Sequence, residues 1–135
     1  ISDDFLFNKM IVSKRVSYFE NSVRNQAEES YVFDDGIIKA ILTIGDCRDA
    51  DKATSFELWG IYVDPFFKRQ GIGSIMVDYC EKCAVERGFN EVCLWVLEKN
   101  ADARLFYEKH GYSPDGAEKL IESLAATEIR YSKRL

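Results

Sequence analysis

The segment with the clearest chemical potential spans residues 63–74, where an apolar stretch meets a basic turn that contains two glycines. Gly71 and Gly73 carry no Cβ atom, so a ligand can approach the backbone closely. A helix beginning here adds free backbone N–H groups and a positive dipole end, and both favour a bound phosphate. Lys68 and Arg69 add positive charge. The spacing fits neither a P-loop nor a dinucleotide fingerprint, so the segment predicts a site for a pyrophosphate on another carrier.

A second segment, residues 100–112, reads Asn-Ala-Asp-Ala-Arg-Leu-Phe-Tyr-Glu-Lys-His-Gly-Tyr. Together the two segments resemble the GCN5-related N-acetyltransferase (GNAT) superfamily. That family combines a strand ending in Val-x-Pro, an Arg/Gln-x-x-Gly-x-Gly/Ala loop and a later Asn-x-x-Ala-x-x-Phe-Tyr-Glu-Lys-x-Gly-Phe segment. The match covers roughly Glu57 to Tyr112. Lys68 stands where the family usually has Arg or Gln, which keeps a donor but removes a planar fork.

The resemblance implies a mixed α/β domain that takes acetyl-CoA as its co-substrate and needs no metal. The backbone of residues 61–63 is expected to pair with the pantetheine amides, since an extended amide-bearing molecule satisfies unpaired strand groups. The pyrophosphate is expected on the glycine loop. The residues that the resemblance assigns to the cofactor are Ile61, Tyr62, Val63, Lys68, Arg69, Gln70, Gly71, Ile72, Gly73, Ser74, Asn100 and Tyr107.

Acetyl transfer from a thioester to an amine needs an unprotonated nitrogen, a stabilised oxyanion and a proton for the departing thiolate. The resemblance assigns proton donation to Tyr107, which in isolation would be interpreted as aromatic packing on a short helix. Glu57, the only carboxylate in an otherwise apolar strand, matches the base of histone-type members. The alternative for Glu57 is an exposed strand-end residue, because other members deprotonate the amine through water chains.

The first half of the chain must supply the antiparallel part of the sheet. An amphipathic helix is expected within residues 3–24, where apolar side chains recur at helical spacing. Residues 31–44 predict a hairpin around Asp34-Asp35-Gly36. The strand at residues 54–63 is nearly continuous in apolar side chains, which predicts burial on both faces. The family's usual opening strand is absent or reduced to residues 1–2, so the chain is trimmed or the sheet begins at the hairpin.

The second half alternates helices and strands. A helix of about five turns is expected from residue 70 to a C-cap at Gly88. Residues 92–97 predict a strand parallel to the one at 54–63, since a right-handed helical crossover joins them, and the family resemblance implies that this central pair splays at the cofactor. Asn100 caps a short helix that Gly111 closes, residues 114–116 predict a turn, and residues 128–133 predict a terminal strand.

The composition predicts one folded domain over residues 1–135, since 47% of the residues are apolar and 13% aromatic. Twenty-three acidic against 18 basic residues give a net charge of −5, which opposes a nucleic-acid partner and favours cationic amines. Five aspartates either steer such cations or are ordinary turn residues: Asp34, Asp35, Asp46, Asp49 and Asp51. No apolar run predicts a membrane span and no signal-like segment opens the chain. A cytoplasmic protein is therefore expected, and a homodimer is compatible with these features.

The four cysteines, Cys47, Cys80, Cys83 and Cys93, match neither a secreted disulfide framework nor a zinc pattern. Cys80 and Cys83 lie one helical turn apart, and small apolar core fillers are favoured over a redox or metal pair. His110 precedes Gly111, where an imidazole favours a helix C-terminus, and this role is favoured over a catalytic one.

These features predict an acetyl-CoA-dependent N-acetyltransferase that moves an acetyl group directly to a primary amine of a small molecule or peptide end. One alternative is a non-catalytic acyl-CoA-binding regulatory module on the same fold, against which the presence of both Glu57 and Tyr107 argues. The other is a mononucleotide-binding α/β protein, which lacks here the expected acidic ribose partner and Ser/Thr-metal arrangement.

Overall fold

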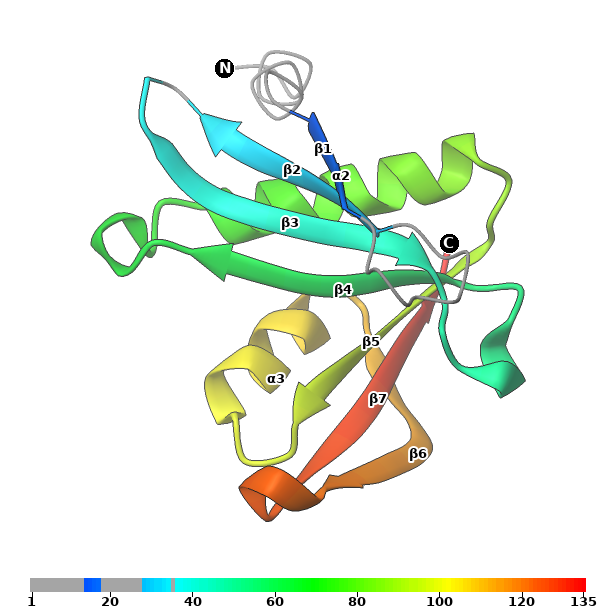
Figure 1. Cartoon of the computed structure of the whole chain (residues 1–135). Helices are drawn as coiled ribbons and strands as arrows, with labels where there is room; N and C mark the ends of the chain where they lie inside the picture. Colours follow the sequence, from blue (N-terminus) through cyan, green and yellow to red (C-terminus); the bar gives the residue numbers. More distant parts are fainter. Residues whose placement is uncertain (1–13, 18–27, 35) are drawn as a thin grey trace.

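The structure is a computed structural model that describes residues 14–17, 28–34 and 36–135. Within these residues, seven strands form one mixed sheet in the order β1-β2-β3-β4-β5-β7-β6, and two helices complete the fold (Figure 1). The strands are β1 (Lys14–Ser17), β2 (Glu28–Asp34), β3 (Ile38–Asp46), β4 (Phe56–Val63), β5 (Glu91–Leu97), β6 (Ser113–Ile121) and β7 (Ala126–Arg134). The helices are α2 (Ile72–Glu86) and α3 (Ala101–Lys109), with short 3-10 turns at Ala50–Lys52, Pro65–Phe67 and Glu122–Leu124.

The antiparallel half begins one strand earlier than predicted. The hairpin of β2 and β3 is confirmed, and Gly36 adopts a φ of 115° at its tip. The predicted first helix is wrong at Lys14–Ser17, which pair antiparallel with β2 as strand β1, while its other residues lie outside the described part. The N–H and C=O groups of these residues form hydrogen bonds with the edge of β2, whereas the helical periodicity predicts hydrogen bonds within a helix. The described sheet therefore begins at β1.

Strands β4 and β5 form the predicted parallel pair, and they part soon after they meet. They pair only at Phe56–Val92 and Glu57–Cys93, whereas β4 stays paired with β3 as far as Val63 (Figure 1). On β3, Ile44 pairs with Leu58 and Thr43 with Gly60, which leaves Trp59 as an extra residue in β4. Such a bulge bends a strand, so it accounts for the divergence. Gly60 inside a strand was the available sequence signal.

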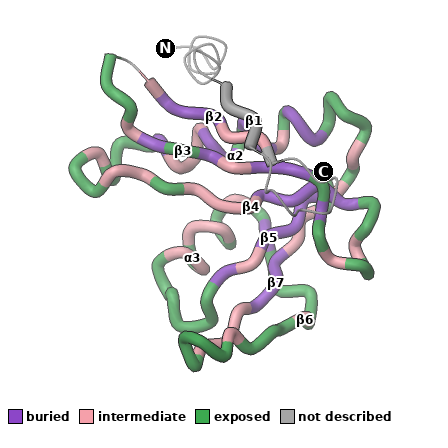
Figure 2. The backbone as a smooth tube through the Cα atoms, viewed as in Figure 1, coloured by how far each residue is buried: buried purple, intermediate pink, exposed green. Residues whose placement is uncertain are grey.

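Burial along β4 follows this divergence and corrects the prediction of burial on both faces. Phe56 and Leu58 lie in the core, but Tyr62 near the far end is 59% exposed. Figure 2 shows the same change from buried to half-buried along the strand. The second half of β4 does not pair with β5, so its backbone groups on that side have no strand partner in β5.

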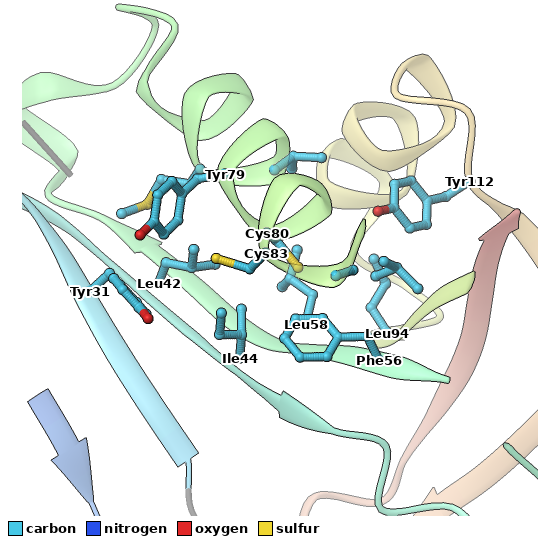
Figure 3. Packing of buried hydrophobic residues seen from close by; sticks show 14 of the residues in the cluster. Tyr31, Leu42, Ile44, Phe56, Leu58, Tyr79, Cys80, Cys83, Leu94 and Tyr112 are labelled. Atoms are coloured by element: carbon cyan, nitrogen blue, oxygen red, sulfur yellow. The ribbon is translucent and has the colours of Figure 1, made fainter. Parts of the chain in front are cut away.

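One core lies between the sheet and α2. Its helix face consists, as predicted, of Ile72, Met76, Tyr79 and Cys83, and all four are buried. Figure 3 shows Cys80 and Cys83 directed at Leu42, Leu58 and their neighbours, which confirms both cysteines as core fillers. The helix has 15 residues, just over four turns rather than five. Gly88 follows it with a φ of 88°, as a C-terminal glycine should.

Helix α3 and the last two strands complete the sheet's second half. Asn100 caps α3 as predicted, since its Oδ1 accepts a hydrogen bond from the Ala103 N–H at 3.1 Å. The terminal strand is confirmed as β7, antiparallel to β5. The predicted turn at residues 114–116 is instead an irregularity inside β6, where the pairing with β7 shifts between Pro114 and Glu118. Neither helix of the described part is long and apolar enough to cross a membrane.

Candidate active site

The glycine loop leads from β4 into an uncapped N-terminus of α2. The Asp64 carboxylate accepts the Phe66 N–H at 2.9 Å and starts the 3-10 turn after β4. Gly71 is the N-cap with a φ of 79°, and none of the described side chains caps the helix there. Because the Ile75 N–H donates to the Gly71 carbonyl at 3.2 Å as the first bond of the helix, the N–H groups before it have no helical acceptor. With Lys68 and Arg69 exposed beside them, these groups can hold an anion.

The two loop glycines have different roles, which the sequence did not distinguish. A Cβ at Gly71 would meet nothing within 4 Å, so this position faces open space. A Cβ at Gly73 would lie 3.1 Å from Cζ of Phe106. Gly73 therefore lets α3 pack closely on α2, and its lack of a side chain is explained by the fold rather than by a ligand. A bulky substitution there would test packing as well as cofactor binding.

We expect Gly73→Ala to lower the free energy of unfolding by about 1 kcal/mol, because overpacking against the Phe106 ring outweighs alanine's better helix propensity. In a Phe106→Leu background the same substitution should become neutral or stabilising, since the ring is gone. Urea unfolding of the four proteins in this double-mutant cycle measures the coupling. A stabilising effect of Gly73→Ala in the parent would show that the ring moves aside at no cost.

The far end of α3 meets the first turn of α2, so the structure brings the two sequence segments together. Ser74 Oγ lies 3.0 Å from His110 Nε2 in hydrogen-bonding contact. The ring of His110 also packs against Phe106, with centroids 4.8 Å apart. His110 is thus the C-cap residue predicted from sequence, and in addition it links the two helices. No periodicity in the sequence signals this link.

Tyr107 packs partly buried against the core, with its ring edge-on to Tyr112 and Phe106. Burial, with a smaller contribution from Cys80, raises the pKa of Tyr107 to about 12. No described residue hydrogen-bonds to its hydroxyl. The phenol is therefore protonated at neutral pH, and its proton is not committed to an acceptor in the described part of the chain.

Glu57 is buried, with 1% of its surface exposed, which excludes the alternative of an exposed strand-end residue. Arg48 engages both carboxylate oxygens: its Nη2 donates to Oε2 at 2.7 Å, and its Nε and backbone N–H donate to Oε1 at 3.2 and 3.1 Å. The guanidinium of Arg48 also lies 4.0 Å from the Trp59 ring. Sequence reasoning missed Arg48, because it lies in a loop without a recognisable pattern. Its donors orient the Glu57 carboxylate.

A second ion cluster alters the interpretation of the acidic loops. Arg130, only 4% exposed, donates to Asp49 at 3.1 Å and to both oxygens of Asp51 at 2.8 and 2.7 Å. Its Nε donates to Asp115 at 2.7 Å. Two of the five aspartates expected to steer cations are thus paired internally, and Asp35 lies outside the described residues. Internal pairing weakens the steering hypothesis.

Residues 3–112 match the acetyltransferase (GNAT) family, and the chain belongs to this family. It is 34% identical over 70 residues to an uncharacterized N-acetyltransferase of Methanocaldococcus jannaschii, a match that covers 50% of this chain and 31% of the relative. The matched region thus spans about a third of the length of that relative.

Solved structures show the same fold at low identity. The IAA acetyltransferase from Bacillus cereus superposes with a TM-score of 0.70 at 15% identity, covering 80% of this chain and 78% of that chain. The PaiA N-acetyltransferase from Thermoplasma acidophilum, solved in complex with coenzyme A, gives 0.64 at 20% identity, covering 85% and 65%. The mixed sheet with its parted central strands is therefore the acetyltransferase fold.

Proposed function

We propose that this chain is an acetyl-CoA-dependent N-acetyltransferase that acts by direct transfer to a primary amine. The observation that carries the proposal is the conjunction of three features at one place. The parted end of β4 leads into the uncapped N-terminus of α2. Helix α3 packs on that N-terminus through Phe106 and carries the adjacent Tyr107, whose hydroxyl has no partner among the described residues. Family membership and a neighbour solved with coenzyme A support this assignment.

The cofactor contacts are proposed as follows. The backbone of residues 61–63 offers strand groups on the side that β5 leaves. The N–H groups of residues 71–74, with the side chains of residues 68–70, hold the pyrophosphate. Asn100 uses its carbonyl oxygen to cap α3, so its amide NH₂ stays available for the cofactor.

In the proposed reaction the amine nitrogen attacks the thioester carbonyl carbon, the carbon–sulfur bond breaks, and the Tyr107 hydroxyl donates its proton to the departing sulfur. Glu57 accepts the proton of the amine, directly or through one water. Arg48 holds the carboxylate in one orientation for this step. No covalent enzyme intermediate is formed.

Glu57→Gln should lower kcat by about a hundredfold and remove the acidic limb of the pH–rate profile, because the carboxylate that accepts the amine proton is gone. The deficit should shrink as pH rises, since more acceptor is then already deprotonated. A matched control is Glu91→Gln, which removes another ion-paired carboxylate, bound by Lys52 at 3.1 Å and by Ser55. It should reduce stability and leave kcat unchanged. A pH profile of Glu57→Gln that overlays the parent's assigns proton removal to a water chain.

The proposed acceptor class is a small-molecule or peptide primary amine, which the net charge of −5 favours when the amine carries further positive charge. The test is acetyl-CoA consumption with stoichiometric release of coenzyme A across polyamines, aminoglycosides, amino acids and N-terminal peptides. Turnover with one acceptor class, absent without acceptor, supports the proposal. Tight acetyl-CoA binding without turnover on any amine would favour the regulatory module. Thermal stabilisation by ATP but not by coenzyme A would favour the nucleotide-binding alternative.

A further inference from the structure

Two cysteines far apart in the sequence meet at the β4–β5 junction, on the face of the sheet opposite the core that α2 covers. Cys47 follows the end of β3, Cys93 lies on β5, and their Sγ atoms are 3.1 Å apart. A disulfide has sulfurs about 2.05 Å apart, so closing the bond requires an approach of about 1 Å. Both residues are buried, with 6% of Cys47 and none of Cys93 exposed. They are held as thiols in direct contact, and both are free.

The surroundings favour a thiol pair over a metal site. Asp49 is a third group with an oxygen near both sulfurs. Its Oδ2, however, accepts the Trp95 Nε1–H at 2.9 Å and an Arg130 N–H at 3.1 Å. A structural zinc site takes four ligands of the Cys, His or carboxylate type, and this carboxylate is already engaged by two donors. The described residues that gather here supply only two thiols and that one carboxylate.

The two thiols are also electrostatically unequal. The two sulfurs are in hydrogen-bonding contact, and either can be the donor. This contact with Cys93 outweighs burial and lowers the pKa of Cys47. The same contact, followed by burial, raises the pKa of Cys93. A thiolate-forming sulfur beside a protonated one is the arrangement of an attacking and a resolving cysteine.

We propose that Cys47 and Cys93 form a redox-active pair, which a peroxide closes to an intramolecular disulfide and a thiol reductant reopens. The Cys47 thiol first releases its proton, and its thiolate then attacks one peroxide oxygen. The O–O bond breaks, a Cys47 sulfenic acid forms, and the departing hydroxide takes up the released proton as water. The Cys93 sulfur then attacks the Cys47 sulfur, its proton leaves with the hydroxide as a second water, and the S–S bond forms. One peroxide is reduced and two thiols are oxidised.

The position of this bond couples it to the candidate base. Cys47 immediately precedes Arg48, whose N–H and guanidinium hold Glu57. Cys93 pairs in register with Glu57 across the β4–β5 junction. Closing the disulfide therefore moves the loop that orients the Glu57 carboxylate. This consequence for catalysis rests on the proposed function, whereas the formation of the disulfide does not.

The test treats the reduced protein with a few equivalents of hydrogen peroxide, blocks remaining thiols after denaturation, and maps tryptic peptides by mass. We expect two thiols to be lost and the peptide of residues 40–48 to be linked to that of residues 88–99, both reversed by dithiothreitol. Cys80 and Cys83 are internal controls: burial raises the pKa of both thiols, and they should remain reduced. In the Cys93→Ser variant, oxidation should stop at a Cys47 sulfenic acid, which dimedone traps.

Three results would overturn the proposal. The first is that all four thiols survive peroxide. The second is a crosslink that joins Cys80 or Cys83 instead. The third is that the reduced protein purifies with one equivalent of zinc, which both Cys47→Ser and Cys93→Ser abolish and which prevents the crosslink, because the pair is then a metal site.

Discussion

Replacing Tyr107 by phenylalanine should lower kcat by about a hundredfold and change KM for acetyl-CoA by no more than about threefold. The hydroxyl is partly buried without a hydrogen-bond partner among the described residues, and its pKa is raised to about 12. The hydroxyl is therefore protonated throughout the usual pH range of the assay and can donate its proton to the leaving thiolate. The variant keeps the aromatic ring and its packing, so what is lost is an interaction made in the transition state. Steady-state kinetics on the acceptor found in the screen measures both constants.

The matched control is Tyr112→Phe. Tyr112 is a buried neighbour whose ring lies edge-on to Tyr107, but its hydroxyl is committed, donating to Glu81 at 2.9 Å. Removing that hydroxyl should cost about 1 kcal/mol of stability and leave kcat near the parent value. Tyr107→Phe should show the reverse, with unchanged stability. Full kcat in Tyr107→Phe would mean that the thiolate receives its proton from another group.

Gly71→Asp should raise the Kd for coenzyme A by about a hundredfold, which corresponds to ~2.8 kcal/mol. Gly71 is the N-cap of α2, with open space where a side chain would be. An aspartate at an N-cap accepts hydrogen bonds from the first-turn N–H groups, and these are the groups proposed to hold the pyrophosphate. Its negative charge also repels the ligand. Isothermal titration calorimetry at low and high salt separates the effect of capping from that of charge repulsion. Raising the salt should reduce the difference in coenzyme A affinity between the variant and the parent, because salt screens the repulsion.

Gly71→Ala is the control for backbone strain. Alanine at a φ of 79° carries the same backbone strain as aspartate, but it adds only a methyl group that meets no neighbour. Its affinity for coenzyme A should stay within about threefold of the parent. Gly71→Asp binding as tightly as Gly71→Ala would place the pyrophosphate away from this helix end, even with the fold intact.

Much of the local structure could be predicted from the sequence, because helix ends and helix faces are encoded by neighbouring residues. Asn100 and Gly88 mark helix boundaries through their own side chain or backbone freedom. The apolar face of α2 follows from helical spacing alone. The predictions were wrong where pairing with a distant strand decides the secondary structure. Residues 14–17 pair with the edge of β2, and residues 114–116 form part of β6, which pairs with β7.

The sequence by itself determined the glycine loop, its separation from the Tyr107 segment, and hence the family. The tertiary structure decided which residues contact one another and therefore what role each of them has. It assigned Gly73 to packing against Phe106, supplied Arg48 to Glu57, and joined Cys47 to Cys93 across 46 positions of the chain. It also parted β4 from β5 at a bulge whose extra residue is defined only by the register with β3. Such contacts depend on the relative placement of whole strands and helices, and no local pattern of residue types encodes that placement.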